Sequence, residues 1–251
     1  MLYLMQMKKH LAILLGLCLL LLAGCTGIQR KLLFYPTHHS GDNGLSVWRA
    51  EGKFMGYCRE VPRPRNIWLM LHGNGGQAAD RAYALASFSG RDSVFILEYP
   101  GYGAREGKPS IVAFDAAATE ACRLLQKTFP KTAICVMGES IGSGPACLLA
   151  TLSPPPEKIV LVVPFDRLTS VGADHAGSVA SVILSGKNWD NVSALSKYKG
   201  PVEIFGAQGD EVIPVKHARN LADSIPGAKF HSIPGGHNDW SNQGCVEIRN
   251  P

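Results

Sequence analysis

Six short apolar runs recur along the chain after residue 65, and they restrict the fold more than any other feature of the sequence. They cover residues 67–71, 94–99, 133–137, 158–163, 202–205 and 229–233, of which the last is the weakest. Runs that are apolar throughout are typical of strands in a sheet covered on both faces. Helical patterns lie between them, at 76–88, 110–128, 140–152 and 215–225. This alternation predicts an α/β fold, with a mostly parallel sheet flanked by helices.

Glycine and polar residues follow the apolar runs, at the edge where ligands bind to a parallel sheet. Three of these turns carry Ser140, Asp210 and His237, in that chain order. Ser140 lies in GESIG, residues 138–142, where a buried run ends and a helical pattern begins. A tight turn or a helix N-cap would also place a serine there. A serine on a strand-to-helix elbow, with an acid and a histidine at later strand ends, indicates a nucleophile instead.

The same segments resemble those of a known superfamily. HGNGG at 72–76, EYPGYGAREGKPS at 98–110, GPVEIFGAQGDEVIP at 200–214 and GGHND at 235–239 resemble α/β-hydrolases, and LLFYPT at 32–37 matches the strand entry common there. Within this superfamily the chain is similar to small serine hydrolases with little lid, related to monoacylglycerol lipases and acyl-protein thioesterases. The resemblance implies an α/β-hydrolase domain over residues 25–251, with a short lid region at 166–200.

Each candidate residue has an expected role. Ser140 is the nucleophile and His237 the general base, while Asp210 orients the imidazole. Asp166, one strand earlier, is the rival acid, because some hydrolases place the acid there. The elbow motif assigns one backbone N–H of the oxyanion hole to Ile141, and the resemblance implies that Asn74 supplies the other. This chemistry needs no metal and no organic cofactor.

The first 25 residues differ from the rest. Lys8 and Lys9 precede an apolar run at 11–23, which is shorter than the roughly 20 residues of a membrane-spanning helix. The pattern is typical of a signal peptide over residues 1–24. LAGC at 22–25 resembles a bacterial lipobox, which implies a mature N-terminus at a lipidated Cys25 carrying acyl chains such as palmitate. The alternatives are a plain signal peptide and an uncleaved anchor. We therefore expect a lipid-anchored protein of the bacterial cell envelope, at the periplasmic or outer face, with the membrane as a partner.

The net charge and the cysteine spacing argue against a nucleic-acid-binding protein and against a cysteine metal site. Without residues 1–24, which carry two lysines and no acid, the net charge falls from +5 to +3. So mild a charge, without basic runs, predicts no nucleic-acid binding. Five cysteines remain beyond Cys18 and Cys25, and none has metal-ligand spacing. Cys135 and Cys147 lie in apolar segments and are expected to be buried thiols. Neither a disulfide nor an oligomeric state can be assigned.

The sequence therefore predicts a membrane-anchored serine hydrolase that cleaves an ester or thioester of a small-molecule acyl substrate through an acyl-enzyme. Two rival hypotheses stay open: a non-catalytic lipoprotein that uses the fold as a binding module, and a serine peptidase. A small lid favours an open site, with substrates presented at a membrane surface. Only 14 residues follow His237, which is short for the final helix usual in such folds.

Overall fold

The computed structural model describes residues 31, 33–39, 44–176, 188–242, 244 and 246–248. The predicted signal segment, Cys25 and the part of the lid region at 177–187 lie outside the described residues. None of the helices within the described ranges is long and apolar enough to cross a membrane.

The described residues form one eight-stranded sheet in the order β1-β2-β4-β3-β5-β6-β7-β8. Neighbouring strands from β4 to β8 pair in parallel, whereas β2 is antiparallel to both β1 and β4. The predicted mostly parallel sheet is confirmed. The strands are β1 (Ser46–Ala50), β2 (Lys53–Arg59), β3 (Asn66–Leu71), β4 (Ser93–Leu97), β5 (Ala133–Glu139), β6 (Lys158–Val162), β7 (Val202–Ala207) and β8 (Lys229–Ile233).

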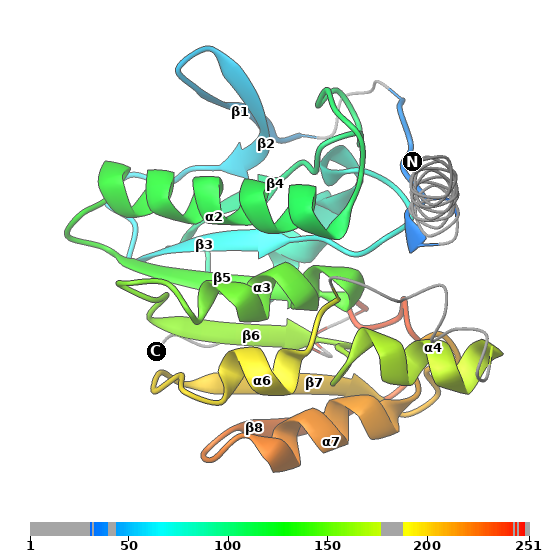
Figure 1. The fold of residues 1–251 in the computed structure, drawn as a ribbon. Helices are drawn as coiled ribbons and strands as arrows, with labels where there is room; N and C mark the ends of the chain where they lie inside the picture. Colours follow the sequence, from blue (N-terminus) through cyan, green and yellow to red (C-terminus); the bar gives the residue numbers. More distant parts are fainter. Residues whose placement is uncertain are drawn as a thin grey trace, which may run out of the picture.

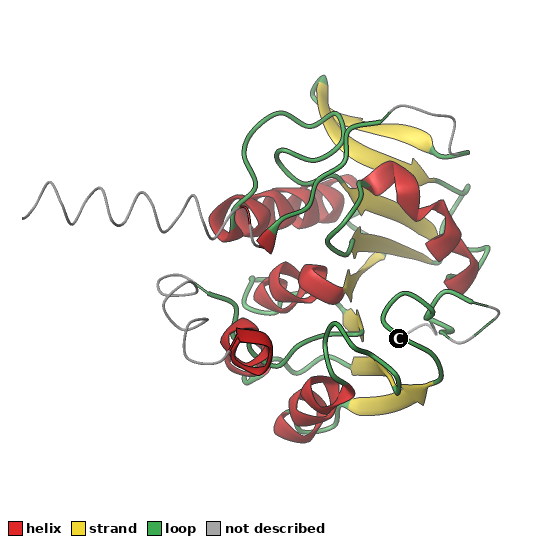
Figure 2. Cartoon of the chain, turned by 90° about the vertical axis from the view of Figure 1, so that its right-hand side faces the viewer, coloured by secondary structure: helices red, strands yellow, loops and turns green. Residues whose placement is uncertain are grey.

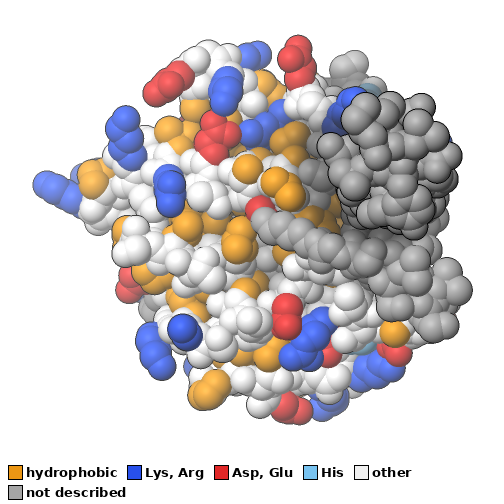
Figure 3. Space-filling view, viewed as in Figure 1, with side chains coloured by type: hydrophobic (Ala, Val, Ile, Leu, Met, Phe, Trp, Pro, Cys, Tyr) orange, Lys and Arg blue, Asp and Glu red, His pale blue; other side chains and the backbone are white. Residues whose placement is uncertain are grey.

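Helices cover both faces of this sheet. One face carries most of the helical segments, whereas the 3₁₀ segment η1 and the C-terminal segment lie on the other (Figures 1 and 2). On the first face, charged side chains of both signs are scattered among apolar ones (Figure 3). The helical segments are η1 (Ala78–Ser87), α2 (Ile111–Thr128), η2 (Ser140–Gly142), α3 (Ser143–Leu149), α4 (Leu168–Ala176), α6 (Asn191–Leu195) and α7 (Val215–Ser224).

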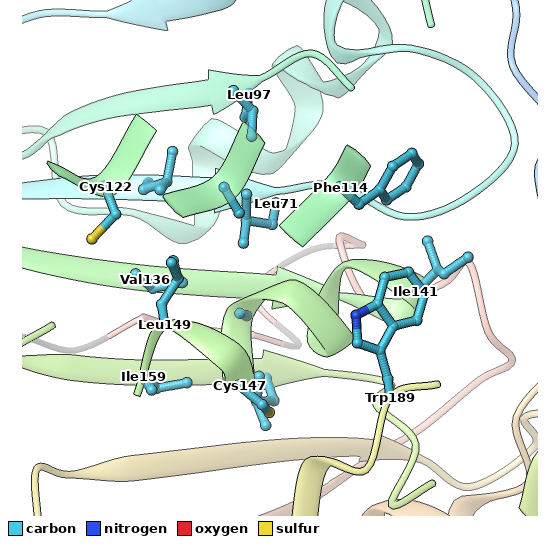
Figure 4. Packing of buried hydrophobic residues seen from close by; sticks show 14 of the residues in the cluster. Leu71, Leu97, Phe114, Cys122, Val136, Ile141, Cys147, Leu149, Ile159 and Trp189 are labelled. Carbon is cyan, nitrogen blue, oxygen red and sulfur yellow. The ribbon is translucent and has the colours of Figure 1, made fainter. Parts of the chain in front are cut away.

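The sheet separates two apolar cores, because successive side chains of a strand point to opposite faces. In β3, Leu69 and Leu71 pack against α2 and α3, whereas Trp68 and Met70 pack on the η1 side. Figure 4 shows part of the first core, which includes Val136, Leu149 and Phe114. Two covered faces explain why the central strands are apolar throughout.

Three features differ from the sequence-based expectation. The antiparallel hairpin β1–β2 was not predicted, because β1 is largely exposed and carries little apolar signal. The segment at 32–37 forms no regular strand in its described part, where Pro36 makes an isolated bridge with Gly76. The helix expected at 140–152 divides into η2 and α3 and ends at Leu149.

The described part of the C-terminal segment contains no helix, and it packs without one. Val246 and Ile248 are buried in the core on the η1 side. The backbone N–H of Ile248 donates to the carbonyl of Ser87 at 2.8 Å. This segment therefore covers part of the face that a final helix would otherwise cover.

Candidate active site

Ser140, His237 and Asp210 lie side by side at the carboxyl edge of the sheet. The distance from His237 Nε2 to Ser140 Oγ is 2.8 Å, and from His237 Nδ1 to Asp210 Oδ2 it is 2.7 Å. Ser140, Asp210 and His237 follow the ends of β5, β7 and β8, and His237 is 97 residues from Ser140 and 27 from Asp210 in the sequence. The structure thus brings together the serine, histidine and acid selected from the sequence.

Ser140 sits on a strained turn between β5 and η2. Its φ is +53°, in the left-handed region that residues other than glycine rarely adopt. Two flanking glycines make the turn possible, because a Cβ on Gly142 would lie 2.1 Å from the Leu71 carbonyl oxygen and one on Gly138 would lie 2.6 Å from Ala146 Cβ. The turn raises Ser140 Oγ toward His237, at the cost of backbone strain.

Asp210 is held by its own loop. Its Oδ1 accepts hydrogen bonds from the backbone N–H groups of Val212 at 2.9 Å and Ile213 at 2.7 Å, which leaves Oδ2 for His237. The side chain of Asp210 is only 1% exposed, so its bond to the imidazole is shielded from water.

The rival acid Asp166 has a different partner. Its Oδ1 lies 2.8 Å from Nδ1 of His217, a buried residue on α7. The other ring nitrogen of His217 lies 2.9 Å from Asp174 on α4. The structure therefore pairs Asp210, and not Asp166, with His237.

Asn74 and Ile141 both border the cavity that Ser140 opens into. The side-chain oxygen of Asn74 is already bonded within the protein. Its Oδ1 accepts hydrogen bonds from the backbone N–H of Tyr35 at 3.0 Å and from the Tyr102 hydroxyl at 2.9 Å. Within the described part of the chain, the Asn74 backbone N–H has no hydrogen-bond acceptor. Its main chain, and not its side chain, is the group left for a ligand.

A cavity of about 830 Å³ opens beside Ser140 and His237. One wall comes from α4, in the predicted lid region, and another from the loop after Asp210. His175 on α4 joins the two walls, with its Nε2 2.8 Å from the carbonyl oxygen of Val212. Apolar atoms provide most of the lining surface, and the apolar side chains on it are Leu33, Tyr35, Ile141, Phe165, Leu168, Val171, Val212 and Ile213.

Other polar residues have structural contacts. His72 is fully buried, with its ring 4.4 Å from that of Tyr99. Cys58, Cys122, Cys135 and Cys147 are free and buried, as predicted for the last two. In the described residues, no three His, Cys, Asp or Glu side chains are grouped as metal ligands.

The fold and the site define a class: an α/β protein with a Ser–His–Asp arrangement at the carboxyl edge of its sheet. No protein-family model matches the chain. An uncharacterized protein of Mycobacterium tuberculosis is 30% identical over 84% of this chain and 81% of its own length. The lysophosphatidylserine lipase ABHD12 of Danio rerio is 27% identical, over 83% of this chain and 64% of its own length.

Solved structures show the same fold. The esterase Pf2001 of Pyrococcus furiosus superposes with a TM-score of 0.63 at 13% identity, over 84% of this chain and 91% of that one. Est1E of Butyrivibrio proteoclasticus superposes with a TM-score of 0.62 at 14% identity, over 80% and 92%. The chain therefore has the α/β-hydrolase fold. The lipase name of the Danio rerio relative supports a hydrolase.

Proposed function

We propose that the protein is a serine hydrolase that cleaves carboxylic esters or thioesters through an acyl-enzyme. The observation that carries the proposal is the continuous hydrogen-bonded chain from Asp210 through His237 to Ser140. A serine hydroxyl is a weak nucleophile unless a base takes its proton as it attacks. His237 Nε2, 2.8 Å from Oγ, is placed for that transfer.

The reaction proceeds in two halves. Ser140 Oγ bonds to the acyl carbon while its proton moves to His237 Nε2; the bond to the leaving oxygen or sulfur then breaks, and His237 returns the proton to the leaving group. A water molecule then gives one proton to His237 Nε2 as its oxygen bonds to the acyl carbon; the bond from that carbon to Ser140 Oγ breaks, and His237 returns the proton to Ser140 as the acid is released. Asp210 stabilises the imidazolium that forms in both halves.

The backbone N–H groups of Ile141 and Asn74 are the proposed oxyanion hole. Both residues border the cavity beside Ser140. Each such donor stabilises the tetrahedral transition state by about 2.7–4 kcal/mol. Because these donors belong to the main chain, replacing the side chains of Ile141 or Asn74 tests them poorly.

The proposed substrates carry an apolar acyl chain. The lining of the cavity is largely apolar, and Tyr35 and Val212 on it are 54% and 51% exposed. A lipidated Cys25 would be eight residues from Leu33, also on the cavity, which is a span of about 28 Å at most for an extended chain. Such an anchor would hold the cavity near the membrane surface. The lipase and esterase names of relatives agree with an ester substrate.

Labelling with a fluorophosphonate probe tests the nucleophile. We expect the wild-type chain to be labelled and Ser140→Ala to remain unlabelled. Equal labelling of both would refute the assignment of Ser140. Failure of both to label, together with no turnover of p-nitrophenyl esters, would favour the non-catalytic binding module, and turnover of peptide amides in preference to esters would favour a peptidase.

A second experiment tests the anchor. The full-length chain and Cys25→Ser are expressed in a bacterium and compared on a soluble p-nitrophenyl ester and on acyl esters embedded in vesicles. We expect equal rates on the soluble ester and a rate at least about tenfold higher for the anchored chain on vesicles, because tethering raises the effective concentration. Equal rates on both would show that anchoring does not direct the enzyme to membrane substrates.

A further inference from the structure

The carboxylate of Glu139, the residue before Ser140, joins the serine elbow to the loop that carries Asn74. Glu139 is buried, and its Oε2 accepts a hydrogen bond of 2.8 Å from the backbone N–H of Gly73. Its Oε1 accepts from the Trp240 indole N–H and from the Tyr83 hydroxyl, each at 3.2 Å. Burial beside this carboxylate raises the pKa of Tyr83, so the hydroxyl remains a donor.

Arg81 holds the same loop from the other side. Its Nη2 lies 3.4, 3.0 and 2.7 Å from the carbonyl oxygens of Gly73, Asn74 and Gly75, and its Nε is 3.9 Å from Glu139 Oε2. Burial lowers the pKa of Arg81, but the Glu139 carboxylate and Tyr83 outweigh this effect and the net shift is upward. The guanidinium therefore stays charged while it binds three consecutive carbonyls.

These contacts decide where the Asn74 N–H points. The Gly73 carbonyl and the Asn74 N–H belong to one planar trans peptide unit, so they point in opposite directions. Nδ1 of His72 lies 2.7 Å from the Gly73 oxygen, and since a carbonyl only accepts, this nitrogen carries the proton. With Arg81 and His72 on its oxygen side, the unit directs the N–H of Asn74 the opposite way.

We propose that Glu139 and Arg81 are positioning residues that hold the 73–75 loop against the Ser140 elbow and so set the distance between the two oxyanion donors. The inference rests on the proposed serine-hydrolase function. Both residues border the cavity, and the role proposed for them is to hold the loop, not to take a proton from the substrate or bond to it. Their effect falls on the transition state, because an oxyanion hole stabilises a charge that is absent from the bound ester.

The chain contains matched controls at the opposite end of the sheet. Arg59 also donates to three backbone carbonyls, those of Leu85, Ser89 and Asp92, at 3.4, 2.9 and 3.2 Å. Asp92 is a buried carboxylate that accepts an indole N–H at 3.2 Å, from Trp68, as Glu139 does from Trp240. These groups lie at the amino ends of β3 and β4, away from Ser140.

The test compares Glu139→Gln and Arg81→Lys with the controls Asp92→Asn and Arg59→Lys. Four quantities are measured for each: kcat and KM on a p-nitrophenyl ester, the inhibition constant of an alkyl trifluoromethyl ketone, and Tm. The ketone forms a tetrahedral adduct with the serine, so its oxygen probes the oxyanion hole. We expect kcat to fall and the inhibition constant to rise by a similar factor of about 10 to 100 in the test variants, with KM little changed.

Each outcome decides the proposal. The controls are expected to lose Tm to a similar extent while kcat and the inhibition constant stay near wild type. Losses in the test variants no larger than in the controls, or confined to KM, would overturn the positioning role while leaving the serine-hydrolase function intact. A wild-type chain without turnover or labelling would overturn both. Should neither test variant fold, Tyr83→Phe decides by the same measurements, because Tyr83 is 40% exposed and its hydroxyl contacts both charged groups.

Discussion

Replacing Asp210 by asparagine is expected to abolish most activity without unfolding the protein. In the native site Oδ1 accepts the backbone N–H groups of Val212 and Ile213, and Oδ2 faces His237 Nδ1 at 2.7 Å. Two N–H donors require an acceptor, so the oxygen of an asparagine would take the Oδ1 position. Its NH₂ group would then face the imidazole, and Nδ1 would have to accept a hydrogen bond.

The consequence is the wrong tautomer. With Nδ1 as acceptor, the proton of neutral His237 lies on Nε2, which faces Ser140 Oγ and can no longer take its proton. The corresponding change in a serine protease lowers kcat by about 10⁴, or about 5 kcal/mol in the barrier. The Asp210 side chain is 1% exposed, so water does not replace the lost interaction.

Comparing Asp210→Asn with Asp210→Ala separates the loss of activity from the loss of stability. Asp210→Ala leaves two backbone N–H groups without their acceptor, which costs about 1–3 kcal/mol each when such groups stay buried. We therefore expect Asp210→Asn to lose activity with a nearly native urea midpoint, and Asp210→Ala to lose both.

Ester hydrolysis and urea unfolding measure the two effects. Asp166→Asn is the matched control, because Asp166 is also buried and bonded to a histidine ring, that of His217, and we expect its kcat to stay close to wild type. A kcat of Asp210→Asn within tenfold of wild type, or a larger loss in Asp166→Asn, would refute this reasoning.

Three further predictions concern packing and the cavity. Burial raises the pKa of the Cys122 thiol to about 12, so this thiol should resist iodoacetamide at pH 8 in the native protein and react once urea unfolds it, as mass spectrometry can show. Gly144→Ala should lower the free energy of unfolding by about 1–3 kcal/mol, since the new Cβ would lie 2.4 Å from the Trp189 ring, whereas Gly90→Ala meets nothing within 4 Å and should be nearly neutral in urea titrations. Val171→Trp should fill the cavity and lower kcat/KM for a dodecanoyl ester far more than for a butyryl ester; equal losses would place the acyl chain elsewhere.

The predicted strands were recovered with small shifts at their ends, because each buried strand is a local apolar run that a turn interrupts. The β1–β2 hairpin was missed for the converse reason, since Val47 is 53% exposed and β1 shows no such run. The strand ends also allowed Ser140, Asp210 and His237 to be selected, because carboxyl ends of parallel strands meet at one edge.

Contacts between distant segments could not be predicted in this way. Arg81 and Glu139 are 58 positions apart, and neither forms a recognisable motif with the other. The same holds for the cavity wall, where α4 meets the Asp210 loop through His175. The sequence GESIG shows that an acid, Glu139, precedes the nucleophile, but it does not show that Arg81 is its partner.

The amino-acid sequence by itself determined the alternating elements, the strained serine elbow with its two glycines, and the order of the three residues that meet there. These depend on short-range patterns of polarity and on backbone geometry. The tertiary structure decided which acid faces His237, how the 73–75 loop is held, and which helix forms a wall of the cavity. Those choices depend on distances of a few ångströms between segments that only the packing of the sheet and its helices brings together.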